Sequence, residues 1–116
     1  MHHEAASAQN FLAKFSKLTR AFLEASKETF IPLEKELEIL NNYLFLEQVR
    51  FNQFFNFDIR LNETINPETI LLPPMLIQPF VENAILHGVS QLNKKGNITI
   101  SINMKEPNKM VCHVKD

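Results

Sequence analysis

The chain has 116 residues, 45% of them hydrophobic, which is enough to bury one modest core but hardly two independent ones. Its 12 basic residues stand against 13 acidic ones, and the net charge of -1 excludes the broad positive field that holds nucleic acid or an anionic membrane. A single cysteine, Cys112, excludes an internal disulfide and fits a reducing, cytoplasmic compartment.

Helical periodicity is the first feature along the chain. Between residues 8 and 25, apolar residues recur in alternating steps of three and four, which predicts an amphipathic helix over residues 4–27. The narrow seam suits a helical bundle, although an ordinary core-facing helix explains the pattern equally well. We expect the phenylalanines of the seam to be exposed and to need a cover, which predicts a homodimer through this helix; they are Phe11, Phe15 and Phe22.

A break and a second helix follow. Pro32 disfavours helix at Ile31 because its ring crowds the preceding backbone. Glu47 and Arg50 are three positions apart and are expected to pair on the surface of the second helix, a contact that is usually minor. The buried face of this helix, predicted over residues 33–51, is marked by Leu33, Leu37, Leu40 and Leu44.

Alternating apolar and polar residues predict three strands. The first covers residues 55–61, and two more cover residues 98–102 and 110–114. The last two read as a hairpin through residues 105–109. Together with the helices, they predict an α+β fold in which helices cover one sheet.

The third predicted helix follows Pro73 and Pro74 and runs to about His87. Gly88 closes it, and Pro79 should bend it near residues 75–79 because proline removes a backbone hydrogen bond inside a helix. The apolar stretch from Ile70 to Val81 is shorter than the roughly 20 residues that a membrane helix needs. We therefore expect no membrane contact from this chain.

Four polar residues interrupt this apolar helix: Gln78, Glu82, Asn83 and His87. Asn83 and His87 are four apart and share a face, and an amide oxygen suits a hard cation such as Mg²⁺. Asn83 is therefore a candidate for metal-nucleotide binding. The plainer interpretation, which ranks first on the residues alone, is that Gln78 and Asn83 satisfy backbone groups, Glu82 is solvated and His87 is favoured by the helix dipole.

The run from Leu72 to Gly88 resembles the N box of the LytS-like sensor histidine kinases, whose pattern is approximately P-P-x-x-x-Q-P-x-V-E-N-A-x-x-H-G. The family belongs to the GHKL ATPase superfamily. The resemblance implies a truncated two-layer α/β sandwich, with nucleotide between sheet and helices, preceded by the long amphipathic helix. Other segments that resemble the family are Leu18–Arg20, Leu33–Leu37, Tyr43–Leu44 and Glu47–Phe51.

ATP and Mg²⁺ are the cofactors that the resemblance implies. It implies that Asn83 coordinates Mg²⁺ bridging the nucleotide phosphates, with Glu82 and His87 close to that site. The end of the chain from Met110 resembles the strand leading into the family's D-N-G-x-G box, which makes Asp116 the carboxylate that accepts a hydrogen bond from the adenine amino group. Without the resemblance, a terminal aspartate is more often a solvated end.

The chain also departs from the family pattern. Leu86 stands where the family often has lysine, and Pro79 stands where other histidine kinases commonly have a second asparagine. Gly88 and Gly96 are the only glycines, so the glycine-rich lid that cradles phosphates is missing. The P-H-F-x-x-N motif with the phosphoaccepting histidine is missing too, so no catalytic residue is assigned.

We interpret the chain as a fragment of a two-component sensor histidine kinase. Residues 1–30 would be the second helix of the dimerisation region, and residues 31–116 the first half of the ATP-binding domain. The parent, a membrane protein with this part in the cytoplasm, would phosphorylate a histidine and pass the phosphoryl group to a response-regulator receiver domain. The fragment alone is expected to be inactive. The alternative is a non-catalytic helical dimerisation module.

Overall fold

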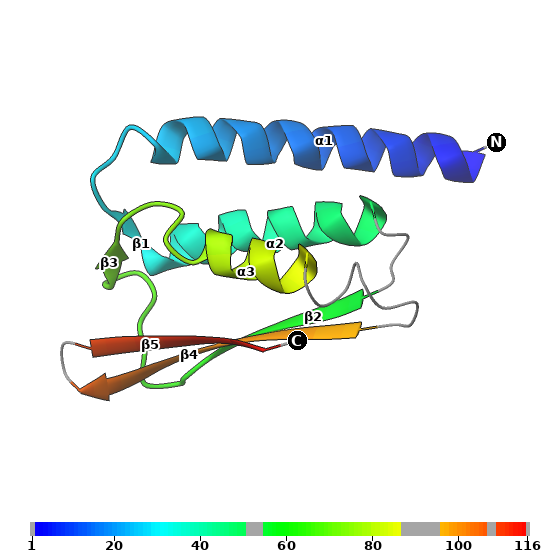
Figure 1. The fold of residues 1–116 in the computed structure, drawn as a ribbon. Coiled ribbons are helices and arrows are strands. Elements are labelled where there is room, and N and C mark those ends of the chain that lie inside the picture. Colours follow the sequence, from blue (N-terminus) through cyan, green and yellow to red (C-terminus); the bar gives the residue numbers. More distant parts are fainter. Residues whose placement is uncertain (1, 51–54, 87–95, 107–108, 116) are drawn as a thin grey trace.

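Three layers make up the structure, a computed structural model that describes residues 2–50, 55–86, 96–106 and 109–115. Helix α1 forms the outer layer, α2 and α3 the middle one, and a three-stranded sheet the third (Figure 1). The α+β class expected from the sequence is confirmed. The elements are α1 (His2–Ala25), β1 (Ile31–Pro32), α2 (Leu33–Arg50), β2 (Phe55–Leu61), β3 (Leu71–Leu72), α3 (Gln78–Ala84), β4 (Gly96–Glu106) and β5 (Lys109–Lys115).

Helix α1 packs along α2 through an apolar seam. Its small and medium side chains approach the second helix closely and form a core cluster of their own, consisting of Leu18, Ala21, Ala25, Ile31, Ile39 and Leu46. Phe11 and Phe22 pack partly against this cluster. The expectation that both phenylalanines are exposed is therefore wrong, because α2 covers them within the same chain. Phe15 does remain exposed.

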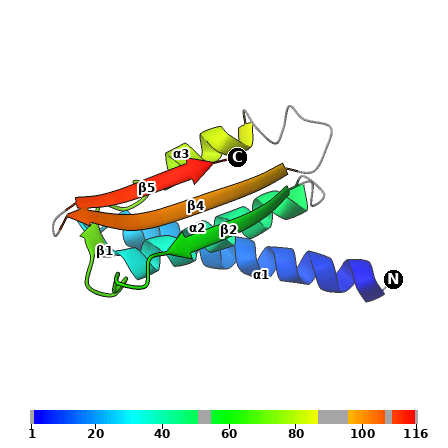
Figure 2. The same cartoon turned by 90° about the horizontal axis from the view of Figure 1, so that it is seen from below.

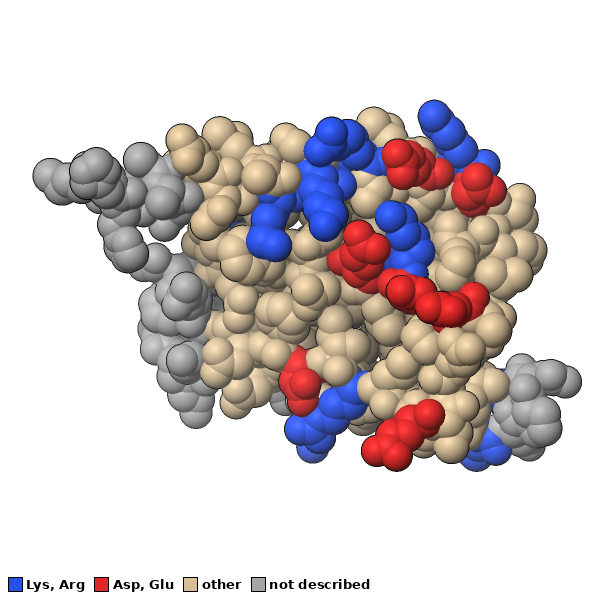
Figure 3. Space-filling model, turned by 180° about the vertical axis from the view of Figure 1, so that it is seen from behind, with Lys and Arg blue, Asp and Glu red and all other residues tan. Residues whose placement is uncertain are grey.

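Charges flank the outer surface where α1 and α2 meet. The carboxylate of Glu38 lies 3.9 Å from the ammonium groups of both Lys17 and Lys35. Figure 3 shows basic and acidic groups interspersed over the back of the molecule. Exposed ion pairs contribute only about 0–1 kcal/mol each. The apolar seam, rather than these pairs, holds the two helices together.

Two short strands, β1 and β3, were not predicted from the sequence. Strands β1 and β3 pair antiparallel, with Ile31 opposite Leu72. Each of these residues precedes a proline, which favours extended backbone. The pairing ties the linker after α1 to the segment before α3, and the first N–H of α2, that of Leu33, donates to the carbonyl of Ile70 at 2.7 Å. These contacts fix where α2 begins.

The sheet has the order β2-β4-β5, as Figure 2 shows from below. Strands β2 and β4 run parallel, and β4 and β5 form the expected antiparallel hairpin. Ile100 lies between Ile59 and Val114, and Ile102 lies opposite Cys112. The alternation predicted for all three strands thus gives one apolar face, which packs against α2 and α3.

The third helix is shorter than the sequence predicted. It begins at Gln78 rather than directly after Pro74, and residues 74–77 form a turn followed by a bend. Pro79 lies in the first turn of α3, where a backbone N–H has no acceptor within the helix, so proline costs no hydrogen bond there. The predicted bend inside a helix is therefore wrong. Met75 has a φ of 62°, a left-handed conformation that ends any helix coming from Pro73.

Helix α2 lies at the centre of the molecule. Its leucines at positions 33, 40 and 44 join the core between α2, α3 and the sheet, while Ile39 and Leu46 join the seam with α1. Tyr43 packs against both clusters. None of the helices in the described part of the chain is long and apolar enough to span a membrane.

Candidate functional site

A buried glutamate accepts backbone hydrogen bonds at the start of α3. Glu36 of α2 is 2% exposed, and its carboxylate accepts hydrogen bonds from the backbone N–H of Met75 at 2.9 Å and of Ile77 at 3.1 Å. Ile77 is the N-cap residue of α3 and has no side chain that can cap the helix. A side chain from another helix therefore supplies the acceptors that the local sequence lacks.

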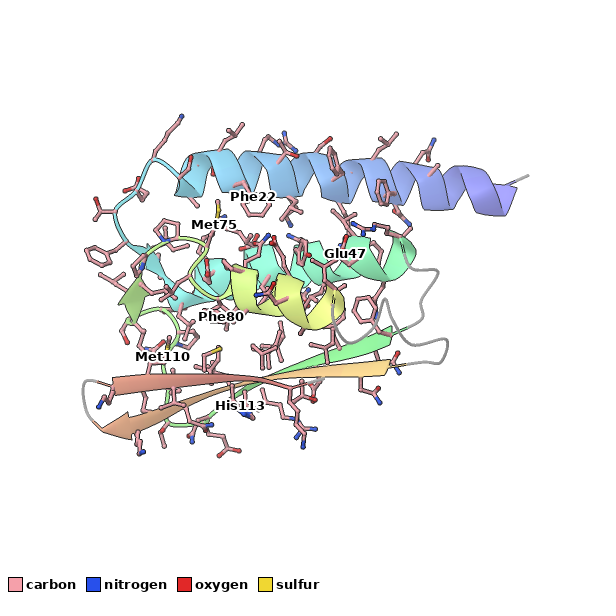
Figure 4. All side chains as sticks on the ribbon, viewed as in Figure 1. Phe22, Glu47, Met75, Phe80, Met110 and His113 are labelled. Atoms are coloured by element: carbon pink, nitrogen blue, oxygen red, sulfur yellow. The ribbon has the colours of Figure 1, made fainter. Side chains whose placement is uncertain are left out.

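An open groove of about 630 Å³ separates α3 from β5. Phe80 projects into this region from α3 and Met110 from β5, whereas His113 lies on the opposite face of the sheet (Figure 4). Phe80 is 64% exposed, so a large apolar ring is available at the mouth of the groove. The groove is lined by Leu76, Ile77, Phe80, Asn83, Ala84, Met110, Cys112 and Val114.

Asn83 brings an amide into this apolar groove. Its side chain is exposed and lies on the groove wall instead of within the packed core. Most other side chains that line the groove are apolar. The position joins a hard oxygen ligand, of the kind that Mg²⁺ prefers, to walls that suit a flat aromatic base.

Glu82 lies in a different hollow, on the side of α3 that faces α2. Its carboxylate accepts a hydrogen bond from the Gln78 side chain at 3.2 Å, one turn earlier. This second hollow, of about 310 Å³, is lined by Tyr43, Glu47, Arg50, Glu82, Ile85 and Leu86. Glu82 and Asn83 are thus adjacent in sequence but do not line the same cavity.

Burial shapes the chemistry of this second hollow. The expected pair between Glu47 and Arg50 is confirmed at 3.4 Å. Burial raises the pKa of Glu47, Arg50 opposes the rise, and the Glu82 carboxylate adds to it. Burial, followed by the charges of Glu47 and Glu82, also raises the pKa of Tyr43 well above the ordinary value of a phenol. The Tyr43 hydroxyl therefore stays protonated beside two carboxyl groups.

Cys112 is the thiol of the groove. Burial raises its pKa above the ordinary value, and the nearby Glu36 raises it further. A thiol of this kind is a poor nucleophile at neutral pH. The charge of Glu36 therefore affects the pKa of a side chain that lines the groove.

His87 and Asp116, two of the expected site residues, lie outside the described residues, so their placement stays a prediction. Residues 2–50, 55–86, 96–106 and 109–115 contain no group of three acidic, histidine or cysteine side chains that would hold a metal. Glu36 was missed by sequence reasoning, which marked only leucines on the buried face of the second helix. Its spacing of three from Leu33 and four from Leu40, on the buried face, was the signal.

Comparison with known proteins gives consistent matches. A family model described as Histidine kinase matches residues 1–55. The sensor protein LytS of Oceanobacillus iheyensis is 37% identical over 105 residues, which cover 90% of this chain and 18% of that protein. The sensor histidine kinase/phosphatase LytS of Staphylococcus aureus is 38% identical over 95 residues, or 82% of this chain and 16% of that protein.

A shorter relative matches along almost the whole chain. The protein YwpD of Bacillus subtilis is 33% identical over 115 residues, which cover 98% of this chain and 40% of that protein. The chain therefore spans less than half the length of each of these three relatives.

Proposed function

The chain belongs to the LytS-like sensor histidine kinases, and from this membership we propose that it supplies a dimerisation helix and part of the Mg-ATP site of a longer kinase. Residues 1–30 are assigned to the dimerisation region and residues 31–116 to the ATP-binding domain. The kinase as a whole uses ATP to phosphorylate one of its own histidines, then passes the phosphoryl group to a response-regulator receiver domain. This part lies on the cytoplasmic side of a membrane-anchored protein.

The observation that carries the proposal is the exposed Asn83 amide in a groove with apolar walls. The adenine base would pack against these walls, and the Asn83 oxygen would help to hold Mg²⁺, which prefers oxygen ligands. The metal ion supplies the charge neutralisation on which phosphoryl transfer depends. By the same proposal, His87 would lie close to the phosphates, and Asp116 would accept a hydrogen bond from the adenine amino group.

Glu82 has a supporting role in this proposal. It lies on the α2 side of α3, tied to Gln78 and opposite Tyr43 and Glu47. From there it fixes the rotation of α3 about its axis, which keeps Asn83 towards the groove. Since residue 86 is leucine, no lysine contacts a phosphate at that position. On its own, the chain binds Mg-ATP weakly at most and does not catalyse transfer.

Helix α1 supplies the dimer contact. On the flank of the seam with α2, Leu12, Phe15 and Leu23 are 63%, 52% and 60% exposed. These residues and Thr19 follow one another in steps of three and four, so they form one stripe. We assign this stripe, rather than Phe11 and Phe22, to contact with a second copy.

Substitution of Asn83 in a sensor kinase that contains this chain tests the nucleotide site. Asn83→Ala should lower autophosphorylation from labelled ATP by on the order of a hundredfold or more, because one fixed metal ligand is lost. Asn41→Ala is the matched control, since Asn41 is an exposed asparagine on the neighbouring helix α2. Equal activity of the two variants would reject the assignment and leave the non-catalytic dimerisation module as the better explanation.

A further inference from the structure

The segment that leads into α3 is held from a distance. Met75 and Ile77 donate their backbone N–H groups to the two oxygens of one carboxylate, that of Glu36, which lies about forty positions earlier in the chain. The carboxylate is almost fully buried. If it were removed, two donors would be left without their acceptor in a place that water hardly reaches, and this is costly.

The local sequence does not by itself fix the backbone conformation at the two donor residues, Met75 and Ile77. Met75 takes a positive φ although it is not glycine, so an external contact must hold it there. Ile77 begins α3 without a side-chain cap. Pro79 fixes only its own φ within the first turn. The start and direction of α3 therefore depend on Glu36.

The same segment forms part of the candidate nucleotide groove. Leu76 and Ile77 line it at the end that Glu36 holds, and Asn83 lines it one and a half turns further along α3. Because α3 has only seven residues, a small tilt at its start moves Asn83 directly. The charge of Glu36 is also felt at Cys112, on the opposite wall.

We propose that Glu36 is a positioning residue of the nucleotide site: through the N–H groups of Met75 and Ile77 it sets the orientation of α3, and so the point at which Asn83 meets the metal of a Mg-nucleotide. This rests on the nucleotide site proposed above. Glu36 touches neither nucleotide nor metal, and its effect passes entirely through the backbone.

Amide exchange and side-chain resonances of the ¹⁵N-labelled chain test the positioning without any ligand. Glu36→Gln keeps the size of the side chain but replaces one acceptor oxygen by a donor. We expect exchange at Met75 or Ile77 to be on the order of tenfold faster, and the Asn83 side-chain amide resonances to shift. Glu38→Gln is the matched control, because Glu38 is exposed on the same helix. Unchanged Asn83 resonances in Glu36→Gln would overturn the proposal.

The second readout is the Mg²⁺ dependence of autophosphorylation in a sensor kinase that contains this chain. Glu36→Gln should raise the Mg²⁺ concentration for half-maximal rate several-fold. Adding Met75→Gly should recover part of this loss, since glycine adopts the positive φ without being held. A normal Mg²⁺ requirement in Glu36→Gln, with activity lost in Asn83→Ala, would reject the role of Glu36. If Asn83→Ala is fully active, the nucleotide site itself is wrong, and the Asn83 resonances still decide whether Glu36 orients α3.

Discussion

The ammonium group of Lys14 lies 5.0 Å from the centre of the Phe45 ring, so that a charge on α1 rests on an aromatic face of α2. Cation-π contacts of this kind contribute about 0.5–1 kcal/mol at exposed sites. The contact lies one turn before Leu18 and so extends the apolar seam between α1 and α2 towards the start of α1. Helix α1 is therefore fastened along one side to its own domain, and only its other side is available to a second chain.

Shortening a side chain in this seam should weaken the fold. Leu18→Ala removes buried methyl groups between α1 and α2 and should lower the free energy of unfolding by about 2–4 kcal/mol. Lys17→Ala, which removes only an exposed ion pair with Glu38, should change it by less than about 0.5 kcal/mol. Urea unfolding followed by circular dichroism measures both. Similar midpoints for the two variants would mean that α1 does not depend on the seam.

Dimerisation should depend on the outer stripe of α1. Leu23→Glu places a charge within the proposed contact between two copies, so the chain should sediment as a monomer at concentrations where the original chain is a dimer. Leu71→Glu is the control, because Leu71 is equally exposed but lies on β3. Sedimentation velocity separates the outcomes. A dimer that survives Leu23→Glu and is lost in Leu71→Glu would move the interface away from α1.

The raised pKa of Glu47 predicts a dependence of stability on pH. A carboxyl group whose pKa is higher in the folded than in the unfolded chain favours folding when protonated. Its contribution is complete below the ordinary value of 4.5 and is lost as the pH rises through the raised pKa. Glu47→Gln should therefore lose less thermal stability than the original chain as the pH rises from 4.5 through the raised pKa. Glu24→Gln, at an exposed position on α1, is the control. Parallel melting curves against pH for all three chains would contradict the shift.

Cys112 provides a chemical probe of the groove. Because burial and Glu36 raise its pKa, little thiolate is present at pH 7, and alkylation by iodoacetamide should be slow and should accelerate as the pH rises. Glu36→Gln removes one cause of the raised pKa and should increase the rate at a given pH. Mass spectrometry of timed samples gives the rates. A rate in Glu36→Gln equal to or below that of the original chain would show that the carboxylate does not act on the thiol.

Periodic elements were predictable from the sequence, and isolated contacts were not. The alternation around Ile59, Ile100 and Cys112 leaves one face for the core, so the strands followed from it directly. Strands β1 and β3 have two residues each, too few to show any period. The start of α3 was misplaced because the conformation of Met75 is decided by Glu36, far away in sequence.

The candidate site shows the same division. Asn83 is exposed and lines the wall of the groove, whereas its role as a metal ligand stays a prediction. Glu82 and Asn83 are one helical step of about 100° apart, so they face different sides of α3. The sequence did not indicate which of these sides faces α2 and which faces the groove. The two sides of α3 can be told apart only when the positions of α2 and β5 are known.

The parallel pairing of β2 with β4 has a consequence for how the chain comes to be folded. Phe57 finds Ile98 about forty positions later, and the whole of α3 lies on the path between them. A ribosome must therefore deliver the whole crossover and the start of β4 before the first pair of this ladder can form, and closing so long a loop is slow. Until then β2 has no neighbour in the sheet, so the contacts between α1 and α2 are the ones that the N-terminal half can form early.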